Sequence, residues 1–322
     1  MNKQSTTIGT RVYKTNSALT QELSFLKDKN YLFNLTTLSA VKVSGEHAAQ
    51  FLQGQLSCDV RLVTATTMQQ GALCNLKGRV LALLDVIYCW NSYWLLLPTD
   101  LVSGTLISLE KTARLSRVSL ETMGNIKVWG IFVQSQPDLL PEMRLPKNIK
   151  EVTTTTTSCC YQMGNHDYVI LNQNNDAALN VPAFKTHQQL RSDLAWHFRQ
   201  LKQHRFSIYP ETRGLFLPHR LNMQNTGYLS FDKGCYKGQE IIARTHYRAT
   251  LKHEFIVTTS QCSTPPQLGA KLYDPETKLE IGELVDYCPI DDENHYLIAC
   301  NVLIGHGTQF WFENALSKQH PL

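Results

Sequence analysis

Short strand-like runs divided by tight turns are the feature that most constrains the fold of this chain. Three of them stand in series, and Lys77-Gly78 and Asn91-Ser92 separate them. Runs of this length with turn residues between them predict an antiparallel meander. The three runs cover residues 69–76, 79–89 and 93–97.

Helical spacing of apolar residues alternates with these extended runs. The predicted helices cover 46–56, 101–114 and 187–203, and the last is the clearest, with Leu190, Leu194, Phe198 and Leu201 on one face. Further extended segments are predicted at 41–43, 118–122, 126–133 and 161–171, the last of these as a hairpin through Gly164-Asn165. Helices that alternate with antiparallel strands predict an α+β fold.

After residue 250 the pattern changes to short strands with turns between them. The predicted strands are 254–258, 271–273, 280–286, 296–302 and 308–312. This spacing is typical of a small β-barrel. We therefore divide the chain near Leu251, into a first region of mixed helices and strands at 1–250 and a C-terminal barrel domain at 251–322.

Composition excludes several classes of protein. With 322 residues, of which 43% are hydrophobic, the chain is long enough for two or three domains with ordinary cores. A net charge of +4 is too small to favour direct tRNA binding. The longest apolar run, 80–90, is interrupted by Asp85 and is shorter than the roughly 20 residues that span a bilayer. Because residues 1–9 are polar, we expect no secretory signal and a cytoplasmic protein.

The nine cysteines do not form a metal-binding pattern. Their spacing is irregular, no C-x-x-C occurs, and the one adjacent pair, Cys159-Cys160, follows a run of threonines. Neither a zinc site nor an iron-sulfur cradle is expected from such spacing. We expect most of the cysteines to be buried, reduced thiols.

Cys235 differs from the other cysteines because Gly234 and Gly238 and two lysines surround it. The segment 231–244 predicts that this cysteine opens a helix, where the helix dipole and the ammonium groups of Lys233 and Lys237 favour thiolate. Glycines on either side allow the backbone to approach a ligand closely. The alternative is a buried structural thiol, and the glycines and lysines favour a functional one.

The segment Asp232-Lys233-Gly234-Cys235-Tyr236-Lys237-Gly238-Gln239-Glu240 resembles the K-G-C-Y-x-G-Q-E signature of the YgfZ family, folate-binding proteins linked to tRNA modification and iron-sulfur enzyme maintenance. Supporting segments stand in family order at 51–60, 74–79 and 216–222, so the resemblance covers about 41–250. The family shares its fold with the T-protein of the glycine cleavage system. The resemblance therefore implies a three-part architecture with a tetrahydrofolate pocket where the parts meet.

Candidate site residues follow from the signature and its supporting segments. For chemistry at the thiol we expect Cys235, Lys233 and Arg244. For folate binding the resemblance implies Trp196, Asn75, Lys77, Gly78, Asn222, Tyr236, Gly238, Gln239 and Glu240.

Most of these residues also have a structural alternative. Asn75, Lys77 and Gly78 could form a hairpin turn, and Glu240 could stabilise a helix dipole. Trp196 could be an ordinary core aromatic.

The resemblance implies an accessory protein that binds tetrahydrofolate and supports iron-sulfur enzymes, including tRNA-methylthiolating ones. Its partners would be those enzymes or cluster-assembly proteins, and a transient cluster would be shared between Cys235 and a partner because one thiol cannot hold it alone. The alternative is a folate-dependent aminomethyl or one-carbon transferase like the T-protein. Aliphatic Leu81 and Ala82 stand where the T-protein has an acidic residue, which disfavours that chemistry.

Overall fold

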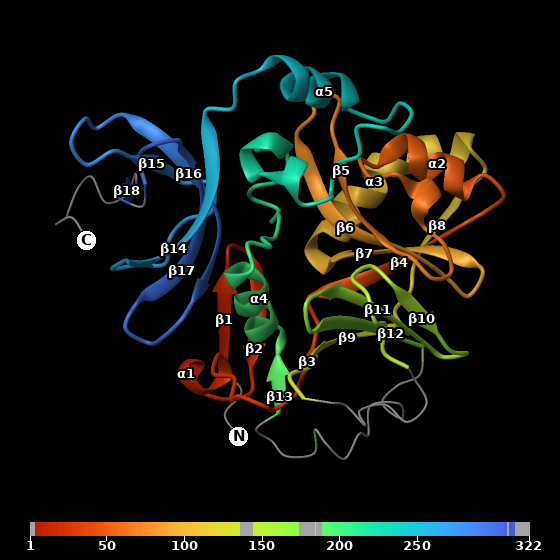
Figure 1. The fold of residues 1–322 in the computed structure, drawn as a ribbon, viewed down its shortest axis with the longest axis horizontal. Helices are drawn as coiled ribbons and strands as arrows, with labels where there is room; N and C mark the ends of the chain where they lie inside the picture. Colours follow the sequence, from red (N-terminus) through yellow and green to blue (C-terminus); the bar gives the residue numbers. More distant parts are fainter. Residues whose placement is uncertain (1–3, 136–143, 174–183, 185–188, 308, 313–322) are drawn as a thin grey trace.

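The computed structural model describes residues 4–135, 144–173, 184, 189–307 and 309–312 (Figure 1). Three large sheets, one two-stranded sheet and several helices make up this part of the chain. The helices are α1 (Leu19–Glu22), α2 (Ala48–Gln55), α3 (Thr99–Leu115), α4 (Asp193–Lys202) and α5 (Gln239–Arg248), with 3₁₀ turns η1 (Val60–Leu62), η4 (Pro218–Leu221) and η5 (Met223–Asn225). A separate hairpin precedes them, made of β1 (Gln4–Ile8) and β2 (Arg11–Thr15).

The predicted meander is confirmed and forms most of the first sheet. In spatial order this sheet contains β5 (Gln69–Cys74), β6 (Val80–Cys89), β7 (Ser92–Pro98), β4 (Leu38–Ser44) and β8 (Ser119–Thr122). Every residue of β5 is buried, and so are most residues of β6 and β7. The predicted helix at 101–114 is α3, which packs on this sheet together with α2.

The second sheet joins strands that are far apart in the sequence. Its order is β10 (Val152–Thr154), β11 (Ser158–Gly164), β12 (Asp167–Asn172), β9 (Lys127–Phe132), β3 (Tyr31–Asn34) and β13 (Leu190–Ser192). The predicted hairpin through Gly164-Asn165 is confirmed by the pairing of β11 with β12. β13 pairs with β3 in parallel, whereas the other described pairs of this sheet are antiparallel.

The predicted helix at 187–203 is wrong at its start. Residues 187 and 188 lie outside the described residues, and Leu190 belongs to β13 rather than to a helix. Its backbone pairs with Leu32 across 158 positions of sequence, a contact that apolar spacing within one segment cannot reveal. The helix begins at Asp193, after Ser192 in an extended conformation.

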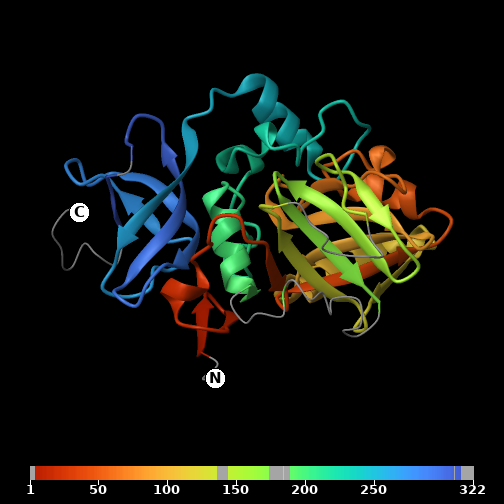
Figure 2. The same cartoon turned by 60° about the horizontal axis from the view of Figure 1, so that its bottom comes forward.

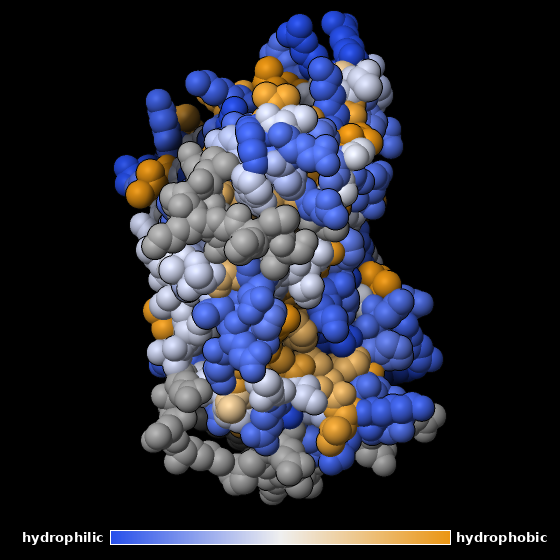
Figure 3. All heavy atoms as spheres, turned by 90° about the vertical axis from the view of Figure 1, so that its left-hand side faces the viewer, coloured by the Kyte–Doolittle hydropathy of each residue, from blue (hydrophilic) through white to orange (hydrophobic). Residues whose placement is uncertain are grey.

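The C-terminal strands form an open sheet, and the predicted closed barrel is not confirmed. Their order is β14 (His253–Gln261), β17 (His295–Leu303), β16 (Glu280–Pro289), β15 (Lys271–Tyr273) and β18 (Trp311–Phe312). Among the described residues, β14 and β18 lie at opposite edges, so the sheet does not close. Figure 3 views the molecule from this side, where hydrophilic residues predominate and hydrophobic residues gather in the lower half.

Helix α4 lies between the C-terminal sheet and the other two sheets (Figures 1 and 2). Its amphipathic sequence buries Leu194, Trp196 and Leu201 in a core that also includes side chains of β3 and β17. A buried polar network crosses the same boundary at Asp286 of β16. Its carboxylate accepts hydrogen bonds from the Tyr209 hydroxyl (2.8 Å) and the Ser207 N–H (2.7 Å), and it lies 3.2 Å from His197 Nε2 of α4.

None of the helices in the described part of the chain is long and apolar enough to cross a membrane.

Candidate functional site

Cys235 does not open a helix, which corrects the expectation from the sequence. Gly238, in the left-handed conformation with φ +85°, precedes α5, whose first residue is Gln239. Cys235 therefore lies in an irregular loop before the helix. It is outside the first turn of α5, and the helix dipole acts mainly within that turn. The Gln239 side chain accepts a hydrogen bond from the Tyr236 N–H (2.9 Å), which holds this loop against the helix start.

Lys233 anchors the Cys235 loop to the end of α2. Its buried ammonium donates to the carbonyl oxygens of Gln53 (2.7 Å), Leu56 (2.6 Å) and Cys58 (2.7 Å). A cation at a helix C-terminus satisfies carbonyls that lack a partner within the helix. Burial lowers the pKa of Lys233 to about 8, so the ammonium form persists at neutral pH. Because the carbonyls use all three N–H donors, none remains for the thiol of Cys235.

The turn between β5 and β6 packs directly against the start of α5. A Cβ on Gly238 would lie 2.4 Å from the Asn75 carbonyl oxygen, so only glycine fits this approach. Asn75, Lys77 and Gly78 form the turn itself, since the Asn75 side chain accepts from the N–H groups of Lys77 (2.9 Å) and Arg79 (3.0 Å). The structure thus brings these three predicted residues next to the Cys235 loop.

Cys235 is the most accessible of the nine cysteines, all of which are described and free. Seven are buried, as expected, and only Cys262 is partly exposed. Burial raises the pKa of Cys58 to about 11 and that of Cys74 to about 12, so these thiols stay protonated at neutral pH. Thiol chemistry with an external molecule is therefore open chiefly to Cys235.

The other predicted residues near Cys235 differ in exposure. Tyr236 is buried, and the Lys233 ammonium lies 4.9 Å from the centroid of its ring. Glu240 and Arg244 are exposed on α5. Asn222, with φ +56°, caps the turn between η4 and η5, and its side chain accepts from Asn225 (2.6 Å).

A separate cavity of about 120 Å³ lies where β2, β6, β7 and α4 meet. Trp196 lines it, and none of the other predicted folate-binding residues does. The rest of the lining combines leucines of β6 and β7 with a few polar side chains. These include Asp85, Asp193, Gln200 and Arg205.

Asp85 is one of the polar cavity residues that sequence reasoning missed. Its buried carboxyl accepts hydrogen bonds from the Tyr161 hydroxyl and from Gln70 Nε2 (3.1 Å), and burial raises its pKa above the ordinary range. The signal was present, because Asp85 is the charged residue that interrupts the longest apolar run. Nothing in one strand's sequence, however, shows that this residue faces a cavity.

The cavity and the Cys235 loop lie at different points along β6. Gly78, just before this strand, contacts α5, whereas Asp85 lies five residues beyond Val80. At a rise of about 3.3 Å per residue, the five residues from Val80 to Asp85 span roughly 17 Å along the strand. The predicted site is thus two neighbouring regions, one around Cys235 and one around Trp196.

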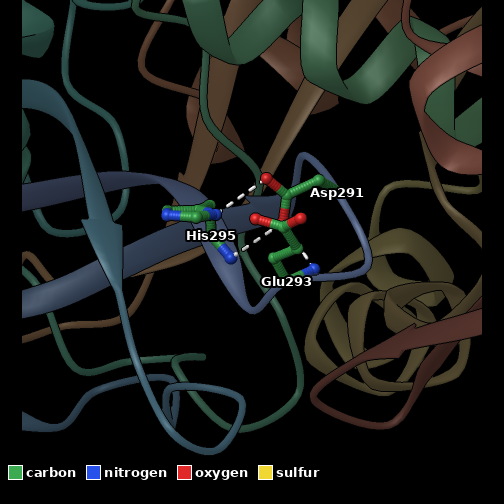
Figure 4. A group of neighbouring side chains, drawn as sticks. All are labelled: Asp291, Glu293 and His295. Atoms are coloured by element: carbon green, nitrogen blue, oxygen red, sulfur yellow. Dashed lines mark hydrogen bonds and ion pairs between the residues drawn. The ribbon is translucent and has the colours of Figure 1, made fainter.

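Asp291, Glu293 and His295 form a cluster in the β16–β17 hairpin whose ligand atoms lie within 4.8 Å of one another (Figure 4). Asp291 already accepts from the N–H groups of Glu293 (2.8 Å) and His295 (3.1 Å), and it contacts His295 Nδ1 at 2.7 Å. These bonds explain the cluster as the support of a tight turn.

A solved structure shares the fold of this chain. The structure is similar to the crystal structure of glycine cleavage system aminomethyltransferase T from Bartonella henselae, with a TM-score of 0.65 over 97% of this chain and 90% of that one. The sequence identity is 14%, so this likeness shows the fold alone, which is T-protein-like.

Sequence relatives then define the family. The tRNA-modifying protein YgfZ of Colwellia psychrerythraea is 30% identical over 247 residues, which is 74% of each chain. The proteins of the same name from Vibrio atlanticus and Klebsiella pneumoniae are 24% and 25% identical, over 70% and 75% of this chain and 68% and 75% of their own. The chain belongs to the YgfZ family. No protein-family model matches it.

His219 predicts acid sensitivity. It is buried next to the stacked rings of Phe231 and His246, and burial together with the charge of His246 lowers its pKa from 6.5 to about 4. Because the folded state favours the neutral ring, its contribution to stability is complete above pH 6.5 and is lost as the pH falls through about 4. When the pH falls from 6.5 to 4, we expect the free energy of unfolding of the wild type to fall by on the order of 2 kcal/mol more than that of His219→Gln. Urea unfolding at the two pH values measures this difference. Equal acid sensitivity in His219→Gln and in the exposed control His47→Gln would contradict this.

Lys233→Met is expected to lower the free energy of unfolding by about 3 kcal/mol, because three buried carbonyls lose their donor. Lys237→Met is the matched control, since the ammonium of Lys237 makes one long contact, 3.5 Å from the Ser108 carbonyl oxygen, and its effect should stay within about 0.5 kcal/mol. Urea unfolding of both variants measures the difference. Loss of Cys235 reactivity in Lys233→Met without loss of stability would instead assign Lys233 to tuning of the thiol.

Proposed function

We propose that this protein is a folate-binding accessory factor of tRNA modification that acts in the cytoplasm through the thiol of Cys235. The observation that carries the proposal is the contrast between Cys235, exposed on an anchored loop, and the seven buried cysteines. Its relatives are named tRNA-modifying proteins, and the signature around Cys235 is the strongest part of the resemblance. The clients we propose are iron-sulfur enzymes, including those that methylthiolate tRNA.

The cavity around Trp196 suits a folate. A flat heteroaromatic ring requires aromatic and apolar walls with a few polar groups at its edge. Trp196 and the leucines of β6 and β7 would supply the walls, and Asp85, Asp193 and Arg205 the polar contacts. Bound tetrahydrofolate would supply a carrier for one-carbon units. The resemblance also implies folate contacts for residues that lie outside the cavity. We propose that these residues bind a part of the folate that extends beyond the cavity; they are Asn75, Lys77, Gly78, Asn222, Tyr236, Gly238, Gln239 and Glu240.

An iron-sulfur cluster would be cargo rather than a resident cofactor. Cys235 offers one thiolate. Cys58 and Cys74, which lie against Lys233 and Gly238 of the same loop, are buried with raised pKa values. A cluster therefore requires further ligands from a partner. In this proposal Lys233 positions the loop, and Arg244 contributes positive charge near the thiol.

Loss of function in Cys235→Ala is the first test. In a deletion strain we expect this variant to restore neither tRNA methylthiolation nor iron-sulfur enzyme activity, whereas the wild type restores both. The matched control is Cys262→Ala, which removes the other accessible thiol and should behave as the wild type. Full restoration by Cys235→Ala at equal protein level would show that the motif is structural.

A one-carbon transferase is the second candidate, and Asp85 is the observation that favours it. It places a carboxyl in the cavity although Leu81 and Ala82 are aliphatic. Both of its oxygens already accept hydrogen bonds, however, so it is poorly placed to take a proton from a substrate.

Incubation with tetrahydrofolate and aminomethyl or methyl donors separates the two functions. We expect no methylene product from the purified protein. Product formed at roughly 1 s⁻¹ or faster, and lost in Asp85→Asn, would favour the transferase.

A further inference from the structure

Helix α5 has a broad exposed face, because five of its ten residues are exposed and four more are partly exposed. Of its ten residues only Ile242 is fully buried, and Tyr247 is 69% exposed. Arg244 and Arg248 are one turn apart and both exposed, so they share a face with Tyr247. An isolated helix of this length is marginal in water, and α5 retains a large face that the described residues do not cover.

The β5–β6 turn extends this face. Leu76 is 79% exposed at the tip of the turn, and Lys77 beside it is exposed as well. The close approach of Gly78 to Ile241 and of Gly238 to Asn75 fixes the turn against α5. In Figure 1 α5 lies over the ends of β5 and β6. We name Leu76, Lys77, Arg244, Tyr247 and Arg248 the α5 surface.

The α5 surface is positively charged. In the described part of the chain, Lys77, Arg244 and Arg248 form no ion pair with a carboxylate. The nearby exposed acids are Glu240 in the first turn of α5 and Asp232 in the loop before it. Unpaired cations on one face attract an oppositely charged partner and raise its rate of association.

We propose that the α5 surface, around the helix that follows the Cys235 loop, docks an acidic face of a partner protein. Exposed Leu76 and Tyr247 among arginines match the composition of protein interfaces, in which tyrosine and arginine are enriched. A nucleic-acid site requires a denser run of cations, which this surface lacks. The chemistry that the docked partner undergoes at Cys235 rests on the proposed function; the docking itself does not.

Disulfide exchange with charged peptides tests the docking. The probes are a glutamate-rich and a lysine-rich peptide of equal length, each with one cysteine held as a mixed disulfide with thionitrobenzoate. The Cys235 thiolate attacks the peptide sulfur, a protein–peptide disulfide forms, and thionitrobenzoate leaves as the measured thiolate. Cys262→Ala is present in every protein so that Cys235 is the reacting thiol.

At low salt we expect the acidic peptide to react at least about tenfold faster than the basic one. Arg244→Glu with Arg248→Glu should abolish or invert this ratio, and about 1 M salt should reduce it. The matched control is Lys14→Glu with Lys29→Glu, which reverses two exposed cations of the N-terminal segment, at the opposite end of the molecule in Figure 1. A change in the thiolate fraction would alter both rates equally, so the ratio isolates docking.

Equal rates for the two peptides, or a preference that survives reversal of both arginines, would overturn the proposal. Transfer RNA that blocks the exchange at lower concentration than free acidic peptide would assign the surface to nucleic acid instead. Failure of docking is distinguishable from failure of the proposed function. If Cys235→Ala functions fully in cells while Cys235 of the purified protein still prefers the acidic peptide, the proposed function is wrong and the docking surface stands.

Discussion

The buried carboxylate of Asp286 is the interaction on which the docking of the C-terminal sheet against α4 depends. It comes from the C-terminal sheet, and the Tyr209 hydroxyl and the Ser207 N–H bind it from the segment after α4. Leaving such donors buried without an acceptor costs about 1 to 3 kcal/mol each, so the C-terminal sheet can dock in few ways. That docking fixes α4, and with it Trp196, between the sheets, where the cavity forms.

A second constraint acts on the Cys235 loop. Lys233 binds three carbonyls at the end of α2, and Gly238 meets the β5–β6 turn at a distance that excludes a side chain. The loop is therefore held at two points on either side of Cys235, which leaves the thiol exposed but positioned. An exposed thiol on a fixed backbone can react with a docked partner, because it is accessible from outside and is held away from the other cysteines of its own chain.

Much of the fold could be predicted from the sequence, because local patterns carry it. The meander from β5 to β7, the helix α3 and the β11–β12 hairpin follow from spacing and turn residues that lie close together. The start of α4 could not be predicted, since β13 exists only through its pairing with β3. For the same reason Asp85 was passed over, because its place in the cavity depends on Tyr161, 76 positions away.

The sequence by itself determined the choice of Cys235, the β5–β7 meander and helix α3, since each of these rests on residues that lie close together in the chain, and several short segments in order indicated the family. Tertiary structure alone decided that Lys233 is an anchor, with carbonyl partners 175 to 180 positions away. It also separated Trp196 from the residues around Cys235, although the resemblance grouped them in one site. The physical reason is that burial, hydrogen-bond partners and cavities arise from contacts between distant segments, and these leave no periodic signal in the chain.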